Sequence, residues 1–82
     1  MSSNWRVPAI NTWRLTEHPY IATVIYDPTT LLYNAHIDVL DGSKRTTITQ
    51  LGDSRKLANA FRNCTRWLAR AERLFSNEAH HG

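Results

Sequence analysis

Arginine spacing in the C-terminal third of the chain is the feature of this sequence with the clearest chemical meaning. Arg62, Arg66 and Arg70 follow one another at intervals of four residues, so on a helix they project from one side. Guanidinium groups bind phosphate or carboxylate in a bidentate manner and also stack on flat rings. A row of them is typical of a surface that binds an extended anion, such as nucleic-acid backbone or an acidic protein.

The arginine row becomes wider when the segment is projected as a helix at about 100° per residue. Five arginines then fall between roughly 140° and 220° from Leu57, opposite the apolar stripe, and no acidic residue interrupts them. Like charges four residues apart destabilise a helix by about 0.2–0.5 kcal/mol per pair, which indicates a surface meant for an anion. The alternative is a solvated helix face, since arginine has good helix propensity. We call this set the arginine side: Arg55, Arg62, Arg66, Arg70 and Arg73.

Other residues beside this row are candidates for the same interface. A turn expected at residues 41–42 adds two cations to the anion-binding set, Lys44 and Arg45. Tryptophan and arginine are enriched at interface hot spots, so Trp67 either anchors a partner or a second copy of the chain, or seals the edge of the core. The predicted partner interface consists of Trp67, Asn59 and Asn63.

Groups suited to catalysis or metal binding are few. Cys64 falls on the apolar side of the expected helix, which predicts a buried, unreactive thiol. The four histidines have no metal-ligand spacing to each other or to Cys64, and the three glycines form no phosphate-binding loop. We therefore expect no enzymatic activity, no cofactor, no metal site and no small-molecule substrate.

The elements that must position these residues are strands followed by one helix. Residues 20–26 are β-branched and aromatic, residues 31–40 alternate apolar and polar, and residues 44–51 are rich in threonine. Asp41-Gly42 predicts a two-residue hairpin turn, which pairs Asp38 with Arg45 and Ala35 with Ile48. Residues 12–16 either form a further short strand or have no regular structure.

The polar face of this sheet is a second candidate surface. The alternation places Asp38 on this face, and we expect the face to be solvated. The residues expected beside Asp38 are Asn34, His36, Arg45, Thr47 and Thr49. The face carries no aromatic ring for base stacking, because the three tyrosines are predicted on the core side or at the edge.

The helix is predicted from Ser54 to Phe75, with Asp53 or Ser54 as its N-cap. Apolar residues spaced 4, 3, 4, 3 and 4 apart form one stripe along it: Leu57, Phe61, Cys64, Leu68, Ala71 and Phe75. We divide the chain into an N-terminal arm (1–19), whose Trp5 and Trp13 pack either on the core or on a partner, a core domain (20–75) and a frayed tail (76–82).

Length and composition set the fold class. The chain has 82 residues, 41% of them hydrophobic, and a net charge of +3, which fits one small domain. One cysteine excludes a disulfide scaffold, and no apolar run approaches the ~18–20 residues of a membrane span. The first ten residues contain no apolar stretch, so we expect no secretory signal there. We expect a cytoplasmic α+β domain in which a three- to four-stranded antiparallel meander packs against one long C-terminal helix.

The order of strands and helix resembles that of several small modules: arm-binding domains of phage-type integrases, antitoxin domains of the HicB kind and small anti-CRISPR proteins. The resemblance covers about residues 20–75 and includes no motif residues, so it implies only that such a chain binds a partner. We expect a non-enzymatic module that contacts DNA or RNA phosphates. The alternatives are a protein-interaction or inhibitor module of phage or mobile-element type that binds an acidic protein, and a homodimeric or larger assembly protein.

Overall fold

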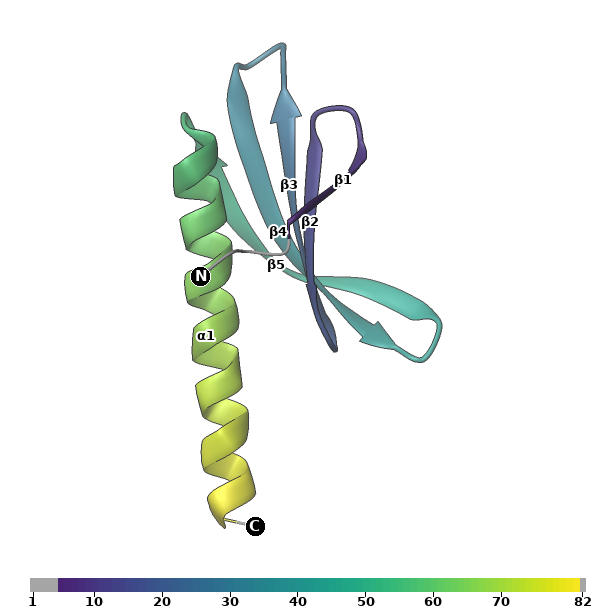
Figure 1. The fold of residues 1–82 in the computed structure, drawn as a ribbon, viewed down its shortest axis with the longest axis vertical. Helices are drawn as coiled ribbons and strands as arrows, with labels where there is room; N and C mark the ends of the chain where they lie inside the picture. Colours follow the sequence, from purple (N-terminus) through teal and green to yellow (C-terminus); the bar gives the residue numbers. More distant parts are fainter. Residues whose placement is uncertain (1–4, 82) are drawn as a thin grey trace.

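The computed structural model describes residues 5–81, with side chains for residues 5–74. Within these residues the chain forms β1 (Arg6–Ala9), β2 (Thr12–Glu17), β3 (Tyr20–Asp27), β4 (Leu32–Asp41), β5 (Lys44–Ser54) and α1 (Leu57–His81). All neighbouring strands are antiparallel, in the order β1-β2-β3-β4-β5 (Figure 1). The α+β meander with a C-terminal helix is confirmed, with five strands in place of three or four.

The N-terminal arm is part of the folded domain. Trp5 stacks on Phe61 of α1, with ring centroids 4.2 Å apart, and Trp13 meets the same ring edge-on at 6.3 Å. Of the two alternatives for the arm, the structure shows packing on the core, and β2 matches the short strand considered for residues 12–16. Strand β1 was missed because its four residues, which include Pro8, are all exposed and do not alternate.

The core lies between α1 and one face of the sheet, which we call the inner face. The helix contacts β3, β4 and β5 and runs alongside them (Figure 1). The expected apolar stripe of the helix is buried at Cys64, Leu68 and Ala71, while the Phe75 side chain lies outside the described part. The buried cluster consists of Leu15, Ala22, Val24, Ala35, Ile37, Ala60, Cys64 and Leu68.

Both ends of α1 differ from the sequence prediction. The carbonyl of Lys56 accepts hydrogen bonds from the amides of Asn59 (3.1 Å) and Ala60 (3.3 Å), so Lys56 occupies the N-cap position. Asp53 and Ser54 were wrong as caps because β5 continues to Ser54. At the other end the helix continues to His81, so residues 76–81, which we expected to fray, are helical, and Gly82 lies outside the described residues. No helix in residues 5–81 is long and apolar enough to cross a membrane.

The hairpin between β4 and β5 also differs from the prediction. Leu40 lies opposite Arg45 and Asp41 opposite Lys44, so the two-residue loop is Gly42-Ser43. Gly42 has φ of +65°, at the loop position where a type II′ turn requires glycine. The predicted Asp41-Gly42 loop was therefore wrong by one residue, because glycine occupies the first loop position and not the second.

Two irregularities in β5 shift its pairing further. Neighbouring residues of β4 pair with residues of β5 that are two positions apart at two places: Asp38 and Ile37 with Thr47 and Thr49, and His36 and Ala35 with Gln50 and Gly52. Each irregularity leaves one residue of β5 without a partner in the register. These are Ile48, which is 46% exposed and does not pair with Ala35 as predicted, and the half-buried Leu51. The shift also places Thr49 on the inner face beside Ile37, where the sequence predicted the polar face.

Candidate nucleic-acid interface

Four of the five residues of the arginine side lie on the part of α1 that faces away from the core. Arg62, Arg66, Arg70 and Arg73 are all exposed, whereas Ala60, Cys64 and Leu68 of the same helix are buried. Both ion pairs in the described part of the chain involve Asp38 of β4, and neither involves these four arginines. Their mutual repulsion is therefore not offset by a described acidic side chain, and an anionic partner would offset it.

Arg55 is the one member of the arginine side that does not lie on the helix. It is exposed in the two-residue link between the end of β5 at Ser54 and the start of α1 at Leu57. The helical projection used for the prediction does not apply to this position. Arg55 therefore adds a cation near the N-terminal end of α1 without continuing the row.

A groove runs between β5 and α1 beside the arginine side. Its volume is about 160 Å³, and it is lined by Leu51, Asn63, Arg66, Trp67 and Arg70. The groove thus joins two residues of the predicted anion-binding set to two of the predicted partner interface. Asn59, the third predicted interface residue, is exposed on α1 and does not line this groove.

Leu51 is the groove residue that the sequence analysis did not select. The second irregularity of β5 sets it at the groove, next to Gly52, whose φ of +84° few other residues adopt. An isolated glycine within a strand pattern is a known signal for a bulge, but the strand predicted at residues 44–51 stops before Gly52.

Trp67 packs against the core at the edge of this groove. Its ring meets that of Tyr20 on β3 edge-on, with centroids 5.1 Å apart and an interplanar angle of 82°. The residue is half-buried and forms part of the core packing, so it seals the edge of the core. The same ring lines the groove, which means that one side chain is both fixed by the core and open to a ligand.

Lys44 and Arg45 lie at the start of β5, in the hairpin that points away from α1 (Figure 1). Arg45 donates a hydrogen bond from Nε to Asp38 Oδ2 at 2.6 Å and another from Nη2 to Thr23 Oγ1 at 3.3 Å. The predicted attraction between Asp38 and Arg45 is confirmed, although the two residues are not directly opposite. The structure does not bring this hairpin together with the arginine side.

Asp38 is buried on the outer face of the sheet, the face opposite the helix. It is 3% exposed, as is Thr23, which contradicts the expected solvated face. Burial by itself raises the pKa of Asp38, but hydrogen bonds from Thr47 (2.6 Å) and Arg45, and the charges of His36 and Arg45, outweigh it and lower that pKa. The network covers the middle of the outer face with Arg45 and Thr47, which the simple alternation of side chains did not indicate.

Cys64 and the histidines are the groups that the sequence analysis considered for catalysis or metal binding. Burial raises the pKa of the Cys64 thiol to about 11, so the thiol is protonated at neutral pH, and the predicted burial of this residue is confirmed. Among the described residues, no three His, Cys, Asp or Glu side chains lie close enough together to hold a metal ion. His80 and His81 lie outside the described side chains.

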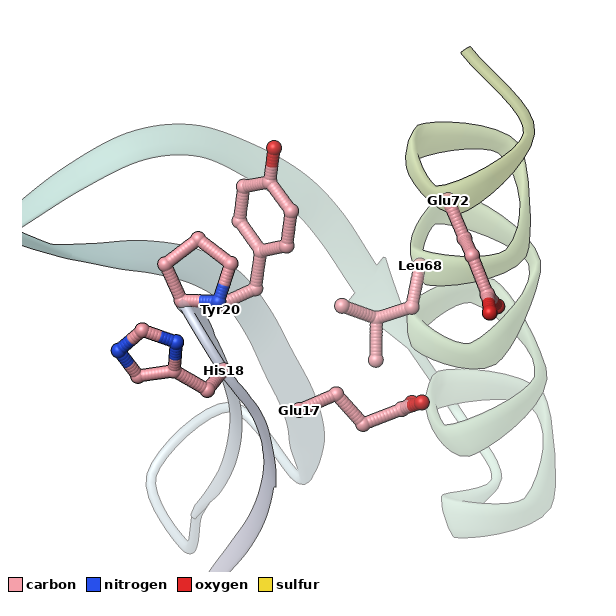
Figure 2. Close-up of a pocket in the computed structure, with 6 residues that line it drawn as sticks. Glu17, His18, Tyr20, Leu68 and Glu72 are labelled. Atoms are coloured by element: carbon pink, nitrogen blue, oxygen red, sulfur yellow. The ribbon is translucent and has the colours of Figure 1, made fainter. Parts of the chain in front are cut away.

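A larger hollow lies on the other flank of α1, next to the turn between β2 and β3. It measures about 410 Å³ and is lined by Glu17, His18, Pro19, Tyr20, Leu68 and Glu72. Glu17 extends toward α1, so the hollow has a carboxylate from the sheet and another from the helix (Figure 2). Two carboxylates repel a phosphate, so this hollow does not extend the predicted anion-binding set.

Comparisons with protein-family models, with curated proteins and with solved structures found no match for this chain.

Proposed function

We propose that this protein is a small non-enzymatic module that binds nucleic acid through its arginine side. The observation that carries the proposal is the row of four exposed arginines on α1 with no described acidic partner. At a rise of about 1.5 Å per residue, Arg62 to Arg73 spans about 16 Å of helix. Duplex DNA carries one charge per about 1.7 Å of its axis, so a row of this length meets several phosphates.

Salt dependence tests this proposal because each neutralised phosphate releases counterions. The logarithm of the binding constant falls with the logarithm of salt concentration by about 0.9 per phosphate contact on a duplex. We would titrate the protein into labelled double- and single-stranded oligonucleotides from 50 to roughly 200 mM salt, the range over which such contacts change affinity strongly. The test variant is Arg62→Gln/Arg73→Gln, which removes two charges from α1 and leaves Arg66 and Arg70 in place.

The matched control is Arg6→Gln/Lys56→Gln, which removes two exposed charges outside the arginine side and gives the same net charge. The proposal predicts that the test variant loses about 2 from the salt slope while the control keeps the wild-type slope. An equal loss in both variants would attribute the binding to net charge alone and overturn the proposal. So would the absence of any binding by the wild type at low salt, after which an acidic protein becomes the partner to search for.

A further inference from the structure

The groove between β5 and α1 differs from the rest of the arginine side because it combines four kinds of contact. Arg66 and Arg70 form its exposed rim, one helical turn apart. Asn63, Trp67 and Leu51 are half-buried and line the same groove. The groove therefore presents two cations, one amide, one indole ring and one aliphatic side chain to the same ligand.

Each of these groups matches a part of one nucleotide. The rim arginines suit a phosphate, which guanidinium groups bind in a bidentate manner. An indole ring suits the face of a base, and an amide suits the donors and acceptors along its edge. Trp67 is already held in place by its edge-on contact with Tyr20, so little side-chain freedom remains to be lost on binding.

We propose that this groove takes one unstacked base and the adjoining phosphate of a single-stranded nucleic acid, an inference that rests on the proposed function. A paired base in a duplex is not accessible to such a groove, whereas a base in a single strand reaches it. An acidic peptide would use the two arginines but not the indole and amide. The hollow on the other flank, with Glu17 and Glu72, has the wrong charge for the same ligand.

The experiment compares three probes of equal length: a single-stranded oligothymidine, the same strand with abasic sites throughout, and a duplex. All three carry the phosphates that the arginine side binds, but only the first presents a free base. The wild type is expected to bind the oligothymidine at least about fivefold more tightly than the abasic strand, because stacking on an aromatic side chain adds that much per base. The Asn63→Ala variant is expected to lose part of this preference, because its amide contacts the edge of the base while Trp67 still stacks on the face, and to keep its salt slope.

Asn59→Ala is the matched control, because Asn59 lies one turn before Asn63 on α1, is exposed and does not line the groove. It should retain the preference for the oligothymidine. Trp67→Leu should remove the preference altogether, and a thermal melt establishes whether it folds. If it does not fold, the Asn63→Ala and abasic measurements decide the question.

Two outcomes would overturn the groove proposal and leave the proposed function standing. One is equal, salt-dependent affinity of the wild type for all three probes, and the other is an unchanged preference in Asn63→Ala. Binding to none of the probes would instead remove the proposed function and this inference together, after which an acidic protein would be the ligand to test.

Discussion

The two faces of the sheet are both buried at their centres, but by different means. On the inner face, Ile37 and Val24 are fully buried against apolar side chains of α1. On the outer face, Asp38 and Thr23 are almost as buried, yet they contact Arg45, whose charged side chain folds over them. Apolar packing stabilises one face, and a hydrogen-bonded ion pair covers the other.

This difference shows that the buried fraction of a residue does not by itself determine how much the residue stabilises the fold. A buried apolar side chain contributes in proportion to the area that it removes from water. A buried carboxylate loses its hydration and regains it only through its partners, so its net contribution is small while the loss of a partner is costly. Four experiments test this contrast.

The largest expected effect belongs to the inner face. Ile37→Ala leaves a cavity beneath α1 and should lower the free energy of unfolding by about 2–5 kcal/mol in urea denaturation. Ile25→Ala is the matched control on the outer face, where the side chain is 40% exposed, and should cost less than about 1 kcal/mol. Equal losses would mean that the two faces are not packed differently.

The thiol of Cys64 reports the same inner face without a change in sequence. Its pKa of about 11, against an ordinary value of 9.0, makes the thiolate about a hundredfold scarcer at neutral pH. Reaction with a chromogenic disulfide should therefore be slow in buffer, speed up at least a hundredfold in denaturant, and rise with pH. Fast labelling of the native protein would show that this part of the core is open to solvent.

The outer face should depend on pH because of Asp38. Its pKa is lowered in the folded protein, so the stabilisation that it provides is present above the ordinary pKa of about 3.9 and is lost as pH falls through the folded value. Asp38→Asn should cost about 1–3 kcal/mol at pH 7 and should flatten the loss of stability below about pH 4.

Asp53→Asn is the comparison for this pH experiment, since it removes an exposed carboxylate from the same sheet. It should leave both the stability at pH 7 and the acid-induced loss close to those of the wild type. If Asp38→Asn also leaves the acid profile unchanged, the ion pair with Arg45 does not contribute to stability.

The smallest effect is expected on the exposed side of α1, which neither apolar packing nor the ion pair of Asp38 covers. Arg66→Gln removes two like-charge contacts at four-residue spacing, with Arg62 and with Arg70, and should raise stability by about 0.4–1 kcal/mol at low salt. The gain should disappear at high salt, because screening already weakens the repulsion. A loss of stability would show that Arg66 makes a contact that stabilises the fold.

Most of the fold follows from local patterns in the sequence. β-branched and aromatic composition located β3, and alternation located β4, each to within a residue or two. The apolar spacing located the buried side of α1 at Cys64 and Leu68. Strand β1 could not be found this way, because an exposed edge strand of four residues carries no alternation. The start of α1 was set too early because Ser54, a good cap by type, pairs with Tyr33 at the end of β5.

The candidate site was predictable only in part, for a different reason. The helical period alone places Arg62, Arg66 and Arg70 on one exposed side. The groove also depends on which residue of β5 lies beside α1, and the two irregularities decide that. Local sequence does not determine pairing at a bulge, so Leu51 could not be placed before the structure was known.

The two flanks of α1 carry charge of opposite sign, with Glu17 and Glu72 around the hollow on one flank and Arg66 and Arg70 on the other. This separation gives the molecule an electric dipole across the helix. Any charged body that approaches to within about 10 Å at 0.1 M salt exerts a torque on it before contact is made. An anion thus meets the arginine flank more often than random collision allows, and the encounter rate rises as the ionic strength falls.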